Sequence, residues 1–184
     1  MPAADLYRDP VLRTPFIHAP MAQTFLSLYW YDQLLRELGI RGVIELGTGS
    51  GILTVLFGLH CPGAVTTIDL IDRRDERTRD LHQRLGITQS GLDCRRDIRL
   101  AGDLIAALPT PRLVFCDNGN KPEEFALYAP MLGSGDAIAV HDSGTEFFSD
   151  QEDTQRVAAA ANLVRWRQQE LDDDETLIAA WVRP

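Results

Sequence analysis

Hydrophobic positions along the chain form short apolar runs that alternate with segments of helical periodicity. The apolar runs predict strands near residues 42–46, 64–69, 112–116 and 136–141. Apolar residues at helical spacing predict helices near 22–38, 51–60, 73–85, 122–132 and 150–164. We also expect a strand near 97–101, a short helix near 103–108, and two final strands near 165–171 and 176–182. A short acidic turn links these last two strands, which therefore must pair antiparallel.

This alternation of strands and helices predicts an α/β fold. The expected architecture is a single Rossmann-like domain over residues 1–184. It has a mainly parallel seven-stranded sheet, helices on both faces and a C-terminal antiparallel hairpin. Residues 1–21 carry four prolines and read as an extended N-terminal arm. Met21, Gln23 and Thr24, beside the first helix, are expected to contact a ligand of the domain.

Composition narrows the class of protein. With 45% hydrophobic and 24% charged residues, the chain resembles an ordinary soluble globular domain. Its net charge of −9 argues against nucleic acid and anionic membranes as partners. The first residues lack the pattern of a signal peptide, and no apolar stretch could span a bilayer, so we expect a cytoplasmic protein. The chain has 17 arginines and one lysine, a bias that favours a bacterial source. Its cysteines (Cys61, Cys94 and Cys116) are widely spaced and predict free thiols.

The segment Val43-Ile44-Glu45-Leu46-Gly47-Thr48-Gly49-Ser50-Gly51-Ile52 is the most informative motif. An apolar strand runs into an acid, three alternating glycines and the start of an apolar helix. Glycine lets backbone N–H groups approach a ligand closely in such a tight turn. The dinucleotide fingerprint does not fit, because Ile52 stands where it needs glycine, and no Gly-Lys-Ser/Thr follows to make a P-loop. The alternative is a turn that only lets strand and helix pack.

This motif resembles the cofactor loop of class I methyltransferases, which bind S-adenosylmethionine (SAM). The resemblance implies that the residues of the loop contact the cofactor: Glu45, Gly47, Thr48, Gly49 and Gly51. Glu45 would lie near the amino end of SAM. The second strand ends in Asp69, which could accept hydrogen bonds from both ribose hydroxyls. Asp72 is the rival for that role, but it reads better as a helix N-cap.

A third acid is expected beyond the third predicted strand. Asp103 follows the strand expected near 97–101, where the family often uses an acid to bind the adenine amino group. Asp103 could equally be the N-cap of the next helix, and both roles can hold together.

The last two parallel strands end in polar segments, Asp117-Asn118-Gly119-Asn120-Lys121 and His141-Asp142-Ser143. Carboxylates at adjacent strand ends can hold a divalent cation. The pattern resembles metal-dependent O-methyltransferases of the catechol and caffeoyl-CoA type, and still more the cephalosporin-biosynthesis and sugar methyltransferase group. By that resemblance Asp117 and Asp142 are metal ligands, with Asn118 or His141 nearby, and Asp117 also borders the cofactor. Bound Mg²⁺ would lower the pKa of a substrate hydroxyl.

Two residues are candidates for the general base. Lys121 is the single lysine of the chain, but it comes four residues after Asp117 where the catechol-type pattern has three. It could instead be an exposed lysine at a helix start. His141 is the rival base, because imidazole titrates near neutral pH. Ser143 follows Asp142 where the catechol-type pattern has asparagine.

The sequence therefore predicts a SAM-dependent methyltransferase that acts on a small molecule at a hydroxyl oxygen, with Mg²⁺ as an additional candidate cofactor and a homodimer as a candidate assembly. The main alternative is a non-catalytic SAM-binding module of the same fold. A third reading is an enzyme of this fold with another reaction, such as aminopropyl transfer or SAM-assisted hydroxylation. The first two differ in whether Asp117, His141 and Asp142 gather beside the cofactor loop.

Overall fold

A computed structural model describes residues 25–184 and shows one seven-stranded sheet. The spatial order of the strands is β3-β2-β1-β4-β5-β7-β6. Their bounds are Gly42–Leu46 (β1), Val65–Ile68 (β2), Thr88–Ser90 (β3), Arg112–Cys116 (β4), Ala137–His141 (β5), Val164–Arg165 (β6) and Ile178–Val182 (β7). Strands β1 to β5 are parallel, and β7 runs antiparallel to both β5 and β6. The predicted α/β Rossmann-like fold class is confirmed.

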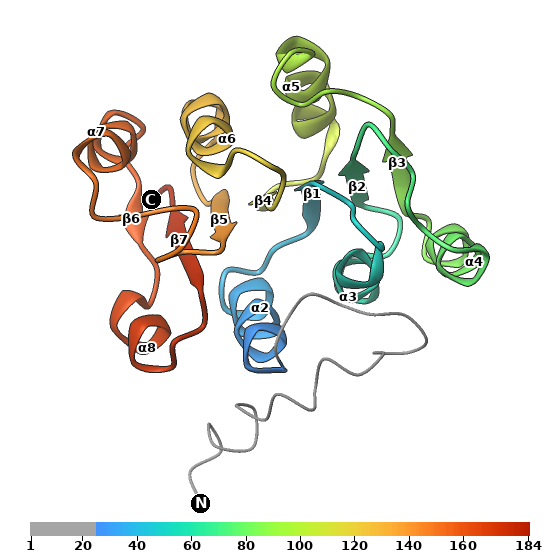
Figure 1. The fold of residues 1–184 in the computed structure, drawn as a ribbon, viewed down its shortest axis with the longest axis horizontal. Helices are drawn as coiled ribbons and strands as arrows, with labels where there is room; N and C mark the ends of the chain where they lie inside the picture. The colour runs from blue at the N-terminus through green and yellow to red at the C-terminus, as the bar shows by residue number, and fades with distance from the viewer. Residues whose placement is uncertain (1–24) are drawn as a thin grey trace, which may run out of the picture.

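Helices cover both faces of the sheet. In Figure 1, α5, α6 and α7 lie above the sheet, and α2, α3 and α8 lie below it. The helix bounds are Phe25–Glu37 (α2), Ile52–His60 (α3), Glu76–Arg84 (α4), Ile98–Ala107 (α5), Lys121–Tyr128 (α6), Glu152–Ala160 (α7) and Gln168–Asp173 (α8), with a short 3-10 turn at Ala129–Met131 (η2). Each face has its own hydrophobic cluster, so the central strands are buried on both sides, as expected for parallel strands.

Aromatic side chains fill both clusters. On the α2 and α3 face, the rings of Tyr31 and Phe115 pack edge to face with centroids 5.1 Å apart. On the other face, the ring centroids of Phe125 and Trp181 lie 4.6 Å apart. These contacts fix the helices against the sheet and hold the strand ends in place.

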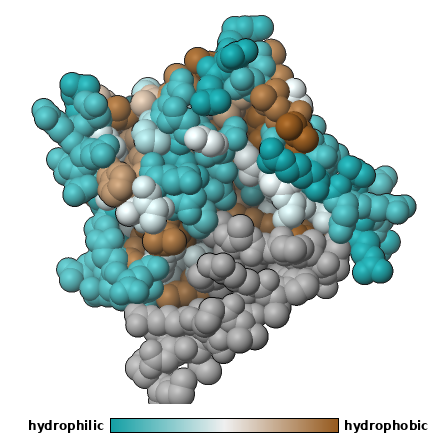
Figure 2. Space-filling model, in the orientation of Figure 1, coloured by the Kyte–Doolittle hydropathy of each residue, from teal (hydrophilic) through white to brown (hydrophobic). Residues whose placement is uncertain are grey.

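Hydrophilic residues make up most of the coloured surface in Figure 2, with hydrophobic residues in smaller patches between them. None of the helices in the described part of the chain has the length and hydrophobicity needed to cross a membrane. The three cysteines are buried and free, as predicted.

The predicted third strand is in the wrong place. Residues 97–101 are not a strand, because Ile98–Ala107 forms helix α5 and buries Ala101 and Ile105 on one side. The real third strand is Thr88–Ser90, a polar segment at the sheet edge whose residues are exposed or half-buried. Such a strand has no apolar pattern, because neither of its faces is fully covered.

The predicted C-terminal hairpin is right in its pairing but wrong in its connection. Strands β6 and β7 do pair antiparallel, yet β6 is only two residues long. Arg167 takes a left-handed backbone conformation (φ 43°), and α8 then buries Leu171. The acidic segment expected as a turn therefore contributes the end of this helix.

Two further expectations concern helix starts. Helix α4 is capped by Asp75, whose carboxylate accepts a hydrogen bond from the Thr78 N–H at 2.7 Å, so the prediction of Asp72 as N-cap is wrong. The arm at 1–21 and the contacts proposed for Met21, Gln23 and Thr24 lie outside the described residues.

Candidate functional site

The glycine turn between β1 and α3 depends on the absence of side chains. All three glycines have positive φ: 100° at Gly47, 51° at Gly49 and 77° at Gly51. A Cβ on Gly47 would lie 2.4 Å from the Asp117 carbonyl oxygen. The turn therefore brings the end of β1 against the end of β4, a close approach that only glycine permits.

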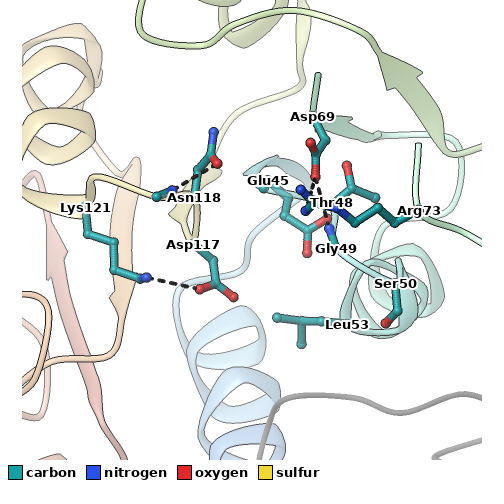
Figure 3. A pocket seen from close by; sticks show the side chains of 12 residues that line it. Glu45, Thr48, Gly49, Ser50, Leu53, Asp69, Arg73, Asp117, Asn118 and Lys121 are labelled. Carbon is teal, nitrogen blue, oxygen red and sulfur yellow. Dashed lines mark hydrogen bonds and ion pairs between the residues drawn. The ribbon is translucent and has the colours of Figure 1, made fainter. Parts of the chain in front are cut away.

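A cavity of about 440 Å³ opens at the carboxyl ends of β1, β2 and β4. It lies where the strand order reverses on either side of β1, the usual place for ligands in open α/β sheets. The lining residues are Glu45, Gly47, Thr48, Gly49, Ser50, Leu53, Asp69, Arg73, Asp117, Asn118, Gly119 and Lys121. Seven of the sequence-predicted residues thus share one cavity, and Figure 3 shows Asp69 and Asp117 on opposite sides of it.

Asp69 immediately follows β2 and faces the glycine turn. Its Oδ2 accepts a hydrogen bond from the Gly49 N–H at 3.3 Å, and its Oδ1 accepts one from the Ile71 N–H at 3.1 Å. Arg73 adds an ion pair at 3.8 Å. The carboxylate is therefore held at the mouth of the turn, in reach of a ligand bound there.

Glu45 lies at the bottom of the cavity and is almost fully buried. Its Oε2 accepts hydrogen bonds from Thr54 Oγ1 at 2.5 Å and from Thr67 Oγ1 at 2.6 Å. Thr48 Oγ1 lies 2.7 Å from Thr67 Oγ1 and must donate to it, because the Thr67 hydroxyl proton already points to Glu45. Burial raises the pKa of Glu45 to about 8, although the two threonine hydrogen bonds oppose the shift.

A second cluster stands at the ends of β4 and β5, beside the cavity. His141 Nδ1 lies 3.2 Å from Asp117 Oδ1 and 3.4 Å from Asp142 Oδ1. One ligand atom from each of these three residues falls within 4.8 Å of the others, close enough to share a metal ion. The left-handed backbone at Asp142 (φ 58°) turns this residue toward β4 immediately after the strand ends.

Lys121 joins this cluster from the start of α6. Its Nζ lies 2.7 Å from Glu146 Oε2, 2.9 Å from Asp142 Oδ2 and 3.8 Å from Asp117 Oδ1. Burial alone would lower the pKa of Lys121, but the hydrogen bonds to Glu146 and Asp142 outweigh it and raise the pKa above its ordinary value. The interpretation as an exposed lysine is wrong, because the residue is 4% exposed. In this environment the ammonium holds its proton, which argues against the expected role as a base.

Asp103 is not at this site. It lies inside α5, where its carboxylate is 65% exposed and pairs with Arg99 at 3.2 Å. The prediction that it follows the third strand is wrong, because the residues expected to form that strand are the N-cap and the first turn of α5. It is neither at a strand end nor the N-cap of α5, which is Asp97.

Two acidic residues next to the site, Glu146 and Glu124, were not predicted from the sequence. Glu146 follows β5 in a loop and reaches Lys121, and nothing in the linear sequence marks it. Glu124 is fully buried in α6, where its two oxygens accept hydrogen bonds from the N–H groups of Asn118 and Asn120 at 3.3 Å each. Glu124 comes four residues after the N-cap Asn120, one position beyond the acid of a capping box, so the capping pattern does not reveal it.

Comparison with known proteins identifies the fold. No protein-family model and no curated protein matches the sequence. Among solved structures, an apo structure of CmcI has a TM-score of 0.70 at 16% identity, over 95% of this chain and 78% of that one. A protein assigned as a caffeoyl-CoA O-methyltransferase from Staphylococcus aureus has a TM-score of 0.58 at 15% identity, over 99% and 92%. The sugar N-methyltransferase KedS8 from Streptoalloteichus sp. has a TM-score of 0.53 at 13% identity, over 85% and 86%.

These similarities confirm the resemblance to class I methyltransferases at the level of the fold. The identities of 13–16% show how the chain is folded and leave the reaction to be argued from the site itself.

Proposed function

We propose that the protein is a SAM-dependent methyltransferase that transfers a methyl group to a hydroxyl oxygen of a small-molecule acceptor. The observation that carries this proposal is the placement of two clusters at one cavity. The glycine turn and Asp69 stand on one side, and Asp117 with Lys121, backed by His141 and Asp142, stands on the other. The side with the glycine turn and Asp69 suits the binding of a nucleoside. The side with Asp117 and Lys121 suits the binding and deprotonation of an acceptor.

At the cofactor side, each group has a task that matches its geometry. The Asp69 carboxylate would accept the ribose hydroxyls beside its existing bond to Gly49, and the N–H groups of the turn would contact the amino-acid part of SAM. Glu45 would face the SAM ammonium from the bottom of the cavity. CmcI has been solved with SAH and with Mg-SAM, which supports this use of the shared fold.

At the acceptor side, His141 is the proposed base. Carboxylates lie within 3.4 Å of its Nδ1 and orient the ring. SAM, when bound, would supply an electrophilic methyl group for the acceptor oxygen, and the His141 imidazole would accept the proton of the acceptor hydroxyl. We assign Lys121 to holding the carboxylates of β4 and β5 rather than to accepting this proton.

The same proposal includes a divalent cation, because two carboxylates and an imidazole converge within 4.8 Å. With the cation bound, Asp117, His141 and Asp142 would hold it, and His141 would then be a ligand instead of the base. Lys121 would give up part of its contact with Asp142. Bound there, Mg²⁺ would supply a positive charge that lowers the pKa of the acceptor hydroxyl.

The alternative is a SAM-binding module without catalysis. The gathering of Asp117, His141, Asp142 and Lys121 beside the cavity favours an enzyme, because a module that only binds SAM has no need for a cluster of partly buried charged side chains there.

Calorimetric titration with SAM and S-adenosylhomocysteine tests the proposal. We expect micromolar binding by the native chain and at least a tenfold loss in Asp69→Ala, because hydrogen bonds to a charged group contribute about 1.5–3 kcal/mol each. Asp103→Ala is the matched control and should bind like the native chain. The proposal fails if the native chain binds neither compound.

A further inference from the structure

A histidine far from the acceptor cluster is built into the support of the glycine turn. His82 lies in α4, is 1% exposed, and has a bonding partner at each ring nitrogen. Its Nε2 lies 2.8 Å from the carbonyl oxygen of Gly51, and its Nδ1 lies 2.9 Å from Arg74 Nη1. Neither the lining of the cavity nor the acceptor cluster includes this residue.

The two partners fix the proton on the ring. A carbonyl oxygen can only accept a hydrogen bond, so Nε2 must carry a hydrogen. A guanidinium can only donate, so Nδ1 must offer its lone pair. The geometry therefore requires a neutral imidazole in its Nε2–H form.

The charges around the ring agree with this state. Burial lowers the pKa of His82, and the positive charge of Arg74 acts in the same direction, against the opposing effects of Gly51 and Asp72. Asp72 neutralises Arg74 through Nε at 2.8 Å and Nη2 at 3.1 Å, and also binds Arg79 at 3.0 Å. The Arg74 guanidinium is thus held in place to donate to His82.

The resulting chain of hydrogen bonds runs from Asp72 through Arg74 and His82 to Gly51. It joins two loops that both face the cavity, since Asp72 and Arg74 follow Asp69 closely while Gly51 ends the glycine turn. A Cβ on Gly51 would lie 2.9 Å from both Arg74 Cγ and His82 Cε1, so the two side chains pack directly against the turn. A ligand that bridges Asp69 and the turn needs both loops in fixed register.

We propose that His82 is a positioning residue that locks the glycine turn to the loop carrying Asp69 through its Nε2–H tautomer, and so sets the affinity for an adenosine cofactor. The part concerning the cofactor rests on the proposed function. The lock itself is a property of the free protein and can be tested without any ligand.

Three variants separate the lock from general stability. His82→Leu removes both hydrogen bonds, and His82→Gln restores an N–H donor at the position of Nε2. His60→Leu is the matched control. His60 lies on α3, the helix that follows the turn, and its Nε2 lies 2.6 Å from Asp32 Oδ1, but it stands at the end of the helix farthest from the turn.

SAM binding by calorimetry should weaken at least tenfold in His82→Leu, and by no more than threefold in His82→Gln and His60→Leu. In the protein without ligand, amide hydrogen exchange at Gly49 and Gly51 should accelerate at least tenfold in His82→Leu alone. The ¹⁵N chemical shifts of the native protein should show His82 neutral with hydrogen on Nε2 between pH 6 and 8.

Equal exchange and equal SAM affinity in native protein and His82→Leu would overturn the proposal, and so would a charged or Nδ1–H imidazole. If His82→Leu does not fold, the proposal is still tested by the ¹⁵N chemical shifts of His82 in the native protein and by the SAM affinity of His82→Gln. Absence of SAM binding by the native chain would defeat the proposed function, whereas the exchange rates and the tautomer would still test the lock.

Discussion

The Lys121 ammonium lies 2.9 Å from Asp142 Oδ2, so a partly buried ion pair joins the start of α6 to the loop that follows β5. The same nitrogen also contacts Glu146 and approaches Asp117. One positive charge therefore holds three carboxylates together at the acceptor side of the cavity.

Removing this charge should destabilise the fold. We expect Lys121→Met to lower the free energy of unfolding by about 1–3 kcal/mol at neutral pH, because breaking a buried pair leaves its partners uncompensated. The partly exposed carboxylates keep the loss below that of a fully buried pair. Urea unfolding measures it, with Arg99→Met as control, since the exposed Arg99–Asp103 pair should contribute less than about 1 kcal/mol. Equal losses in the two variants would contradict the central role of Lys121.

Glu45 should make stability depend on pH. Its pKa rises from an ordinary 4.5 to about 8 on folding, so between these values the unfolded chain has lost a proton that the native chain keeps. The free energy of unfolding therefore falls as pH rises from 4.5 to 8, by at most about 1.4 kcal/mol per pH unit. Glu124, whose pKa burial raises to about 7, acts in the same direction. Chemical unfolding of the native chain and Glu45→Gln at several pH values isolates the Glu45 part, and parallel curves would refute it.

The two glycines at the start of the turn should differ in their tolerance of alanine. Gly47→Ala forces a Cβ against the backbone of Asp117 and should cost more than about 3 kcal/mol, because rigid atoms cannot give way. Gly49→Ala meets no atom within 4 Å and carries only the cost of its positive φ, about 1–2 kcal/mol. Denaturant unfolding of both variants compares them, and a larger loss for Gly49→Ala would contradict the packing described for Gly47.

Divalent cation binding should depend on the ends of β4 and β5. If Asp117, His141 and Asp142 are ligands, Asp142→Asn should weaken Mn²⁺ binding at least tenfold, because the amide oxygen lacks the charge of the carboxylate. Electron paramagnetic resonance counts free Mn²⁺ directly, without need of an acceptor. Asp103→Asn is the control for exposed acids, and an equal loss in this variant would point to nonspecific binding.

The elements that could be predicted from the sequence are those on which burial imposes a pattern. Strands β1, β4 and β5 are buried on both faces, so they appear as apolar runs, and the polar residues that follow them mark the strand ends. Glu45 lies within the buried strand β1, and Asp69 and Asp117 directly follow the buried strands β2 and β4, so the sequence predicts these three acids together at one edge of the sheet. The glycine turn could be predicted because its backbone conformation excludes other residues.

The elements that could not be predicted are those on which burial imposes no such pattern. Thr88–Ser90 is a polar strand at the sheet edge. Ile98 and Leu100 alternate with polar residues as in a strand, but they lie in a helix, and Leu100 is exposed. Because a strand was predicted at 97–101, Asp103 was predicted at a strand end and so at the cofactor site. Lys121 contacts Glu146, 25 positions away, and His82 contacts Gly51, 31 positions away. Such long-range contacts form only through the fold and leave no pattern in the local sequence.

The antiparallel strand β7 also decides how the protein can be attached to a surface. Because β7 runs opposite to β5, residues 183 and 184 lie at the edge of the sheet where the parallel strands begin. There the Arg183 N–H donates a hydrogen bond to the Asp136 carbonyl oxygen, and the Ser134 hydroxyl donates one to the Pro184 carbonyl oxygen. The cavity opens at the opposite edge. A biosensor tether joined to Pro184 therefore leaves the cavity facing the solution, and small ligands can be measured on the immobilised protein without obstruction by the linker.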